Sequence, residues 1–444
     1  MIRKLLIAAV TMIPADLSAQ QLWDLKDCIQ YGLQHHRSNT VYENKKLEAD
    51  AVAKEALSEY LPKIGLSATF DDNLKVQESI IPGGIFGDDP IRVAFSQKYN
   101  TNGSAQLDQT IFDKSLLTGI KAGKFNRQQA ELNLEQNQES IIYNISTAYY
   151  QIFIYQEQLA LLESNLSTYQ KQIDISRLQV EKGTALQMDL DKVRVDYNNA
   201  TSQIRIARSN LALSENQLKY TMGYPIDSTL TVDSTQKEAF THPDLLLIDN
   251  KPFNPENRTD YQISAINAKL LELDEQRLKS GGLPKLSAYA RYGAVGFGNS
   301  IGPAFSDLSP YSAIGLRLNI PLFDFFKRNA QVTQAKYKRL SAAENLKLDQ
   351  DKYRIEYEEA LTKLQKAAAN LETDRGNIDL ARSIFKTTDL QLQKGVTDMT
   401  DWINSQNSIK EAQNNYLNSL FSYYQARIDL EKAAGSLFSF YNAL

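Results

Sequence analysis

The side chains best suited to catalysis or metal binding are few and scattered along this chain. Histidine occurs only at His35, His36 and His242, and neighbouring histidines on a helix point about 100° apart, which makes a poor metal clamp. The pair Glu358 and Glu359 falls on a helix surface, where water would solvate both carboxylates. The sequence has no Gly-rich phosphate loop, nucleophile elbow or Cys/His cluster. We therefore expect no catalytic, cofactor-binding or metal-binding residues, and no enzymatic activity.

Cys28 is the only cysteine, so the chain has no internal disulfide. It follows the polar segment Asp24 to Asp27 and lies well beyond the apolar N-terminus, which is the wrong place for a lipid-modified cysteine. We interpret Cys28 as a small, buried, apolar residue.

The N-terminal segment has the layout of a secretory signal. Arg3 and Lys4 precede the apolar run Leu5 to Ile13, and Leu17-Ser18-Ala19 offers a cleavage site, so residues 1–19 are predicted to be a signal peptide. This run is too short for a helix that spans a bilayer, which needs about 20 apolar residues. No later stretch is long enough, so a place in a membrane would depend on β-strands.

Charge and composition exclude one class of partner and favour one class of structure. The chain has 49 basic and 53 acidic residues, with a net charge of −4, and the two signs are interspersed. No segment forms a basic face for a polyanion, so we do not expect nucleic acid as a partner. Only 20 glycines and 12 prolines interrupt 444 residues, which favours long helices over a loop-rich fold.

The sequence of the first half returns in the second half. Gln179 to Thr184 returns as Gln391 to Val396, and Gly223 returns as Gly435, in both cases 212 residues later. Such a repeat predicts two copies of one structural unit. The predicted units are a signal at 1–19, a first repeat at 20–224 with a β-hairpin at 62–112, a linker at 225–256, a second repeat at 257–437 with a β-hairpin at 284–323, and a tail at 438–444.

Apolar residues recur at alternating spacings of four and three along the helical segments. This period of about 3.5 residues forms one stripe, and burying the stripe against a partner helix makes a left-handed coiled coil. The first-copy stripe is Ile141, Ile145, Ala148, Ile152, Tyr155, Leu159, Leu162, Leu166, Tyr169 and Ile173, continued by Leu190, Val193, Tyr197, Ala200, Ile204, Ala207, Leu211 and Leu218. Adding 212 from Ile145 onward gives the second-copy stripe, whose polar intruder in the long helix is Asp374.

The expected helix lengths favour a tall column of paired helices. A helix from about Lys114 to Glu181 has ~68 residues, or ~100 Å at about 1.5 Å per residue. The flanking helices, about Trp23 to Tyr60 and Ala185 to Met222, have ~38 residues each, or ~57 Å. Two short helices placed end to end therefore match one long helix, and no compact soluble domain is that tall.

Two β-hairpins are expected between the helices. Residues Ile314 to Ile320 alternate strictly between an apolar and a polar face, which is typical of a sheet with one apolar and one wet side. Ile111 would share the apolar side with Ala105 and Leu107. The other expected strands are Leu286 to Val295, Ile64 to Phe70 and Ala105 to Ile111, and Pro62 and Pro284 end the helices before the hairpins.

The apolar side of these strands needs a cover. A small sandwich packed on the helices is one possibility, but the helices already use their apolar stripe in the heptad seam, so lipid is the favoured cover. Four strands cannot close a membrane barrel, because at least about eight are needed. The chain would then share a barrel with copies of itself, and the residues alone leave two copies or three open.

Three short motifs occur twice in the same order. They are a helix ending in Leu-Pro-x-[Ile/Leu], a hairpin closing on [Ile/Leu]-Phe-Asp, and a coil turning at Gly-[Thr/Val] with an Asp six residues after the Gly. Over nearly the whole chain after the signal, this arrangement resembles the TolC family of outer-membrane efflux proteins. The resemblance implies a mainly α fold, in which long antiparallel coiled-coil helices form an α-barrel and four strands per chain enter a shared 12-stranded trimeric β-barrel.

The resemblance also implies a location and a function. It implies a homotrimer in the outer membrane of a Gram-negative-type envelope, spanning the periplasm, with lipid around the barrel. The chain would be a passive exit duct of a tripartite efflux or type I secretion system, with a periplasmic membrane-fusion adaptor protein and an inner-membrane pump as partners. Irregular equatorial segments are implied at 225–255 and after Gly435, and extracellular loops at 72–100 and 296–310.

In this family the turns of the two helical hairpins form a periplasmic tip that binds the adaptor and closes the duct at rest. Those turns match Glu181 to Asp189 and Gln393 to Asp401. Glycine in each turn also ends a helix. Helix termination and adaptor binding are compatible roles, because an adaptor would bind to a tight turn. The implied docking residues are Gly183, Thr184, Gly395 and Val396.

The best-studied family member narrows its entrance with two acidic residues, six and nine positions after the second of these glycines. The first position matches Asp401, whereas the second holds Asn404, so half of the acidic ring is missing here. Three copies of Asp401 around a narrow pore would attract cations. The alternative is an exposed carboxylate with no role in selectivity.

The same family member locks its closed tip with a Tyr three residues before that glycine and an Arg two residues after it. Both contact the Asp of the first turn, which Asp189 matches, but the Tyr and Arg positions hold Leu392 and Thr397. That lock cannot form in this chain. The candidates for a substitute are Asp398, Lys394 and Lys182.

A periplasmic coiled-coil scaffold that never enters a membrane is the alternative to a duct. It would explain the secretory signal and the heptads. It leaves the alternating strands without an explanation, so we favour the duct.

Overall fold

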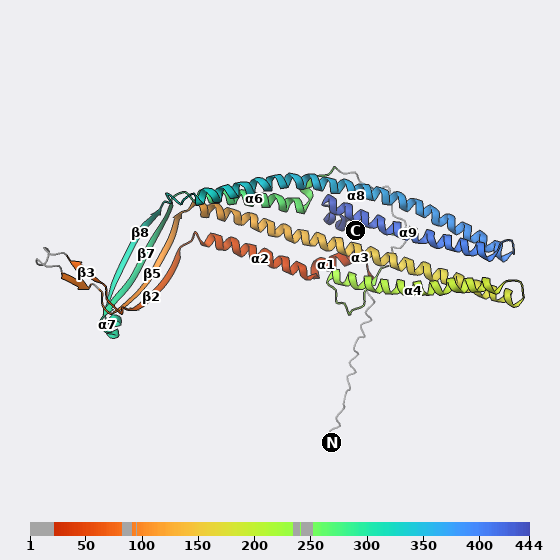
Figure 1. The fold of residues 1–444 in the computed structure, drawn as a ribbon, viewed down its shortest axis with the longest axis horizontal. Coiled ribbons are helices and arrows are strands. Elements are labelled where there is room, and N and C mark those ends of the chain that lie inside the picture. Colours follow the sequence, from red (N-terminus) through yellow and green to blue (C-terminus); the bar gives the residue numbers. More distant parts are fainter. Residues whose placement is uncertain (1–21, 82–90, 95, 234–239, 241–251) are drawn as a thin grey trace, which may run out of the picture. The chain divides into compact units, whose positions relative to one another are not determined.

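The computed structural model describes residues 22–81, 91–94, 96–233, 240 and 252–444 (Figure 1). The chain divides into two compact units, one formed by residues 1–41, 135–259 and 351–444 and the other by residues 42–134 and 260–350. The predicted signal peptide, His242 and much of the predicted linker lie outside the described residues.

The first long helix has the predicted bounds, and the second has nearly the same length. Helix α3 spans Lys114–Glu181 and α8 spans Lys327–Gln393, with 68 and 67 residues. After each long helix comes a helix of 36 residues, α4 at Gln187–Met222 and α9 at Met399–Ala434. Further helical elements are η1 at Pro255–Asn257, α6 at Thr259–Ser280 and α10 at Leu437–Ala443. The segment after Gly435 is therefore helical, and the expectation that it is irregular is wrong.

The single helix expected from Trp23 to Tyr60 is also wrong. Helix α1 spans Leu25–His35 and α2 spans Arg37–Ser58, with an extended residue, His36, between them. The break lies where α4 ends, because a Cβ on Gly223 would be 2.9 Å from the Cα of His36. Helix α2 therefore begins beside the end of α4.

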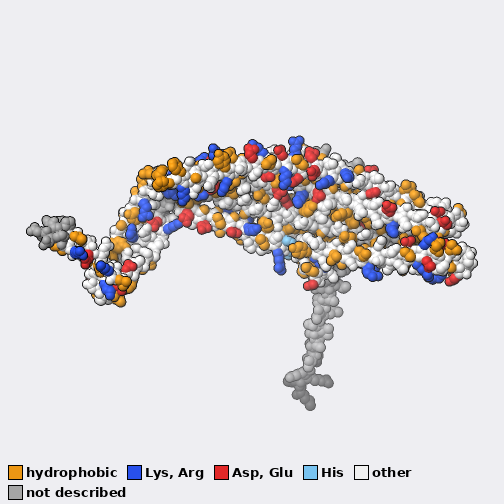
Figure 2. Space-filling view, viewed as in Figure 1, with side chains coloured by type: hydrophobic (Ala, Val, Ile, Leu, Met, Phe, Trp, Pro, Cys, Tyr) orange, Lys and Arg blue, Asp and Glu red, His pale blue; other side chains and the backbone are white. Residues whose placement is uncertain are grey.

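The predicted heptad stripe is the seam between the helices. Every residue of both stripes is buried or partly buried. The polar intruder Asp374 has a partner on the facing helix, since the Oγ of Ser419 donates a 2.5 Å hydrogen bond to its Oδ2. Basic and acidic side chains are interspersed over the visible surface (Figure 2).

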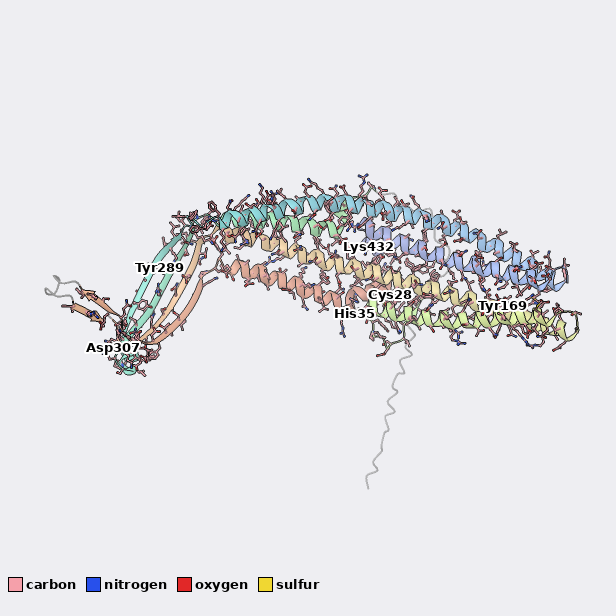
Figure 3. All side chains as sticks on the ribbon, viewed as in Figure 1. Cys28, His35, Tyr169, Tyr289, Asp307 and Lys432 are labelled. Atoms are coloured by element: carbon pink, nitrogen blue, oxygen red, sulfur yellow. The ribbon has the colours of Figure 1, made fainter. Side chains whose placement is uncertain are left out.

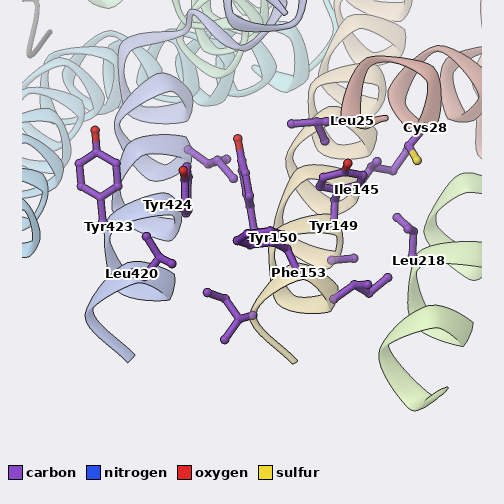
Figure 4. Packing of buried hydrophobic residues seen from close by; sticks show 14 of the residues in the cluster. Leu25, Cys28, Ile145, Tyr149, Tyr150, Phe153, Leu218, Leu420, Tyr423 and Tyr424 are labelled. Atoms are coloured by element: carbon purple, nitrogen blue, oxygen red, sulfur yellow. The ribbon is translucent and has the colours of Figure 1, made fainter. Parts of the chain in front are cut away.

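A large buried cluster joins α1, α3, α4 and α9 (Figure 4). Tyr150 and Tyr424 stack with ring centroids 4.3 Å apart, and the hydroxyl of Tyr424 donates to the carbonyl of Phe240 at 2.6 Å. Cys28 lies in this cluster with 0% of its surface exposed, so its prediction as a buried apolar residue is confirmed. The cluster also meets a short parallel pair of strands, β1 at Leu22–Trp23 and β6 at Thr231–Val232.

Four long strands form an antiparallel sheet in the order β2-β5-β7-β8. Their bounds are Lys63–Asp72, Tyr99–Phe112, Lys285–Gly298 and Leu308–Asn319. The register places Ile64, Leu107, Ala290 and Ile314 in one row across the sheet. This apolar face is open, because Leu66 and Ile314 are 85% and 87% exposed. Neither β2 nor β8 pairs on its outer edge with another described strand.

Local features of the sheet differ from the expectation. The register shifts between Thr110 and Phe112, so Phe112, and not Ile111, lies opposite Leu286. Such a β-bulge sets two residues against one and moves the following side chains to the other face. The expected loop at 72–100 contains the hairpin of β3 (Glu78–Ile81) and β4 (Ile91–Ala94), and that at 296–310 contains α7 (Ile301–Ser306).

No helix in the described ranges combines the length and the apolar character needed to cross a membrane.

Candidate functional site at the helical turns

The turn between α3 and α4 is built on the backbone of one glycine. Gly183 has a φ of 72°, a left-handed conformation that glycine adopts without steric cost. Its N–H donates to the carbonyl of Val180, and the N–H of Thr184 donates to the carbonyl of Gln179, both at 2.9 Å. This pair of bonds is the Schellman motif, which satisfies carbonyls at the end of a helix.

The turn between α8 and α9 has the same construction. Gly395 has a φ of 70°, and the N–H of Val396 donates to the carbonyl of Gln391 at 2.9 Å. A Cβ on Gly183 or Gly395 would meet nothing within 4 Å, so backbone conformation, not crowding, requires glycine. Both turns leave the following side chain, Thr184 or Val396, accessible to a partner.

The acidic residues after the second turn organise the start of α9. The N–H of Asp401 donates to Oδ1 of Asp398 at 2.9 Å, so Asp398 is the N-cap of the helix. The hydroxyl of Thr397 donates to Oδ2 of Asp401 at 2.6 Å. Asp401 remains exposed in the first turn, where the helix dipole favours a negative charge.

The other predicted site residues lie apart from this cap. Asp189 belongs to the first turn of α4, where its Oδ1 accepts from the Nζ of Lys192 at 3.3 Å. Asn404 is exposed one turn beyond Asp401. The structure therefore joins Asp398 with Asp401 and places Asp189 in an ion pair of the other hairpin. No group of three or more His, Cys, Asp or Glu within the described ranges is placed to hold a metal ion.

Comparison with known proteins decides the family. The family model described as "Outer membrane efflux protein" matches residues 45–224 and 272–436, which is more than half of the chain. The chain belongs to this family.

Curated relatives of this efflux protein include secretion and efflux components. It is 20% identical over 397 residues to outer membrane protein TolC of Escherichia coli, covering 86% of this chain and 76% of that protein. It is also 20% identical over 349 residues to the alkaline protease secretion protein AprF of Pseudomonas aeruginosa, covering 74% of this chain and 69% of that protein.

Solved structures share the fold of the efflux protein. CusC superposes with a TM-score of 0.78 at 14% identity, covering 92% of this chain and 91% of that chain. VceC of Vibrio cholerae superposes with a TM-score of 0.74 at 16% identity, covering 93% and 96%. The family consists of outer-membrane channel proteins, not enzymes, and this efflux protein is an outer-membrane protein of a Gram-negative envelope.

One structural residue of the efflux protein's turns was not singled out by the sequence. The ring of Trp402 is fully buried, and its Nε1 donates to Oδ1 of Asp389 at 2.8 Å. Its ring centroid lies 6.2 Å from that of Tyr169 and 5.7 Å from that of Phe385 (Figure 3 labels Tyr169). Trp402 thereby connects α9 with both α8 and α3. The heptad stripe contained Trp402, but Asp389 lies off the stripe, so spacing gave no signal for the pair.

A layer of buried amides lies further along the same helices. The Nδ2 of Asn165 on α3 donates to Oε1 of Gln413 on α9 at 2.9 Å. The Nε2 of Gln406 donates to Oδ1 of Asn165 at 3.3 Å. Burial next to this layer raises the pKa of Tyr169 to about 12, so its hydroxyl is neutral at physiological pH. The amides and Trp402 together hold α3 to α9.

Proposed function

We propose that this chain is one third of a homotrimeric exit duct in a tripartite efflux or type I secretion system. The duct is passive. A periplasmic membrane-fusion adaptor protein and an inner-membrane pump supply the energy, and the duct spans the periplasm. The observation that carries this proposal is a four-stranded sheet with an open apolar face, whose two edge strands pair on one side only among the described strands, joined to helices that bury a heptad seam.

The sheet edges support assembly from several copies. β2 and β8 are the two edge strands, and strand direction alternates through the sheet, so β8 of one copy can pair antiparallel with β2 of the next. Such a head-to-tail interface closes a ring and leaves no free edge. Two copies give a barrel of about eight strands, whose interior is filled by side chains or one small ligand. Three copies give about twelve strands and a wider lumen, which suits a duct.

The outer helices support the same assembly. α3 and α9 contact each other, and α4 and α8 flank them. Both flanking helices carry a second apolar stripe that is exposed in the single chain. On a helix of 3.6 residues per turn, each of these sets shares one face. The stripes are Met188, Val195, Ile206, Leu213 and Tyr220 on α4, and Ile355, Leu380 and Ile384 on α8.

The proposal includes an internal duplication, with repeats at 20–224 and 257–437, a linker at 225–256 and a tail at 438–444. The paired helix lengths, 68 with 67 and 36 with 36, support it. So do Gly223 and Gly435, each with a φ of 71°. A Cβ on Gly223 would contact His36, and one on Gly435 would be 2.5 Å from the carbonyl oxygen of Asn257. Each glycine therefore lies beside the start of a 22-residue helix, α2 or α6.

The turns form the periplasmic tip in this proposal. Gly183, Thr184, Gly395 and Val396 are the docking residues for the adaptor. Asp401 forms a ring of three carboxylates at the constriction, supported by Asp398, with Asn404 neutral beyond it and Asp189 on the neighbouring hairpin. The exposure of Asp401 and the two accessible turns support this assignment.

A planar-bilayer experiment tests the duct and the ring together. The purified mature protein should be a trimer in detergent and form channels with a preference for cations. Asp401→Ala should lower that preference. Asp379→Ala, which removes an exposed carboxylate of α8 paired with Arg382, is the matched control and should not lower it.

Two results would reject parts of the proposal. Unchanged conductance and selectivity in Asp401→Ala would reject the ring. A protein that is a dispersed monomer in plain buffer, or that leaves the membranes on cell fractionation, would reject the duct and favour the periplasmic scaffold.

A further inference from the structure

The polar face of the sheet carries two guanidinium groups that have no carboxylate partner in the described chain. Arg291 on β7 lies opposite Gln106 and Ala313, and Arg317 on β8 lies opposite Ser287. Because side chains alternate along a strand, both arginines lie on the face away from Leu107 and Ile314. The Nε of Arg291 is buried and has no hydrogen-bond partner among the described residues.

Two tyrosines lie flat on the same face beside the arginines. A Cβ on Gly315 would be 2.7 Å from the hydroxyl oxygen of Tyr289, so the Tyr289 ring covers this glycine. Figure 3 labels Tyr289 in the sheet. The guanidinium carbon of Arg317 lies 5.5 Å from the centroid of that ring, in a cation–π contact. Tyr311 covers Gly293 in the same way, since a Cβ there would be 2.7 Å from its Cζ.

In the band of the face that holds the two arginines, the remaining charges do not cancel them. Lys63 and Lys285 are each paired, with Glu59 at 2.6 Å and with Asp113 at 2.7 Å. Asp108 lies directly opposite both Lys63 and Tyr289, and it accepts two hydrogen bonds from the Nε2 of Gln106 at 2.9 and 2.8 Å. Asp71 shares this face but lies opposite Asn100, at the outer end of β2. Two guanidinium groups against one carboxylate leave this band of the face positive.

We propose that the polar face forms an anion-binding collar inside the barrel, made by Arg291, Arg317 and the ring of Tyr289. Three copies contribute six guanidinium groups around one lumen. The collar takes planar or multiply charged organic anions, because guanidinium binds carboxylate, sulfonate or phosphate groups in a fork and stacks on flat ligands. This inference rests on the proposed duct, since the polar face lines a lumen only where the apolar face meets lipid.

The collar and the tip then act as two charge filters in series. The ring of Asp401 favours cations at the periplasmic entrance, whereas the collar favours anions in the barrel. A charged lining in a low-dielectric wall changes the local concentration of mobile ions of opposite sign. Neutralising the tip should therefore reveal the preference of the barrel.

The test uses the full-length protein with Asp401→Asn in planar bilayers under a KCl gradient. In this background, R291Q/R317Q should lower the chloride-to-potassium permeability ratio by about twofold or more. Pyrene-1,3,6,8-tetrasulfonate, added on the barrel side, should block the parent channel and need at least about tenfold more to block R291Q/R317Q. R291K/R317K keeps the charge but loses the fork, so it should retain the permeability ratio and weaken the block.

The outcomes separate this inference from the proposed function. An unchanged permeability ratio and an unchanged block in R291Q/R317Q would overturn the collar and leave the duct standing. A parent protein that forms no channels would overturn the duct and the collar with it. R317Q alone, at an exposed position, should move both readouts in the same direction by a smaller amount, and a trimer of normal mass in detergent shows that the variant is assembled.

Discussion

The indole Nε1 of Trp402 donates a 2.8 Å hydrogen bond to Oδ1 of Asp389, across the turn that joins α8 to α9. The same ring is buried between Phe385 on α8 and Tyr169 on α3. One side chain therefore fixes the second hairpin to itself and to the first hairpin.

Trp402→Ala should loosen both hairpins near their turns. Truncating a buried aromatic costs about 3–5 kcal/mol, so amide exchange should accelerate along α3 around Tyr169 and along the end of α8. Trp402→Phe keeps most of the apolar contact and loses the N–H donor, so it should cost about 1 kcal/mol. Hydrogen exchange read by mass spectrometry measures both effects. Equal exchange in Trp402→Ala and in the exposed control Leu178→Ala would contradict the role of Trp402.

The elements that could be predicted from the sequence are those whose residue pattern repeats over a long stretch. A stripe repeated over about nine turns fixes the extent of α3, and strict alternation identified the apolar face of β8. The break at His36 was not predicted, because it depends on a contact with Gly223, a residue distant in the sequence. The bulge before Phe112 was not predicted, because one extra residue at the end of a strand leaves its alternating pattern recognisable.

At the helical turns, too, local features could be predicted from the sequence, whereas contacts between distant residues could not. Gly183 and Gly395 could be predicted because a left-handed residue between two amphipathic runs needs glycine. The capping role of Asp398 also had a local signal, an acidic residue directly before a helix. The pairing of Trp402 with Asp389 and of Asn165 with Gln413 had none, because polar partners across helices follow from three-dimensional register.

Gly183→Ala and Gly395→Ala should each destabilise the folded protein. Holding a residue with a Cβ in the left-handed conformation costs about 1–2 kcal/mol, and open space around both positions rules out a clash as the cause. Gly395→Asn should cost less, because Asn tolerates this conformation. The control is Gly376→Ala, inside α8 and also uncrowded, which should stabilise the helix by up to about 1 kcal/mol. Denaturant unfolding measures all four, and equal effects at positions 376 and 395 would reject the conformational argument.

The thiol of Cys28 should not react with thiol reagents while the protein is folded. Burial raises the pKa of its thiol, with the charges of Asp24 and Asp27 acting in the same direction, so little thiolate forms at pH 8. Ellman's reagent should react only after denaturation. As a control, C28A/T184C places a thiol on the exposed turn and should react at once. Rapid reaction of native wild type would show that the cluster around Cys28 opens readily.

Acid should weaken the contact between α6 and α8 in the second unit. Hydrogen bonds from Lys279 and Arg339, both at 2.6 Å, lower the pKa of Glu275 below its ordinary value. The charged form is favoured in the folded state, so this stabilisation is complete above about pH 5 and is lost as the pH falls through and below about 4.3.

Hydrogen exchange of amides near Glu275, corrected for the intrinsic effect of pH, checks this. Glu275→Gln should show weak protection that changes little with pH. Glu272→Gln removes an exposed carboxylate of the same helix, paired with Lys269, and should behave as wild type. A wild-type protection that stays constant between pH 5 and pH 3 would contradict the assignment.

Replacing one of the buried amides should destabilise the protein, whereas replacing all three together should not. Asn165→Leu leaves Oε1 of Gln413 and Nε2 of Gln406 without their hydrogen bonds, so it should destabilise the protein by about 1–3 kcal/mol. The triple variant N165L/Q406L/Q413L buries no unpaired amide and should match or exceed wild-type stability, as apolar replacement of buried polar groups often does. Denaturant unfolding of the single and triple variants gives the coupling between the sites. Losses that simply add would show that the three amides act independently, whereas recovery in the triple variant would show that the layer specifies the register of α3 against α9 at the expense of stability.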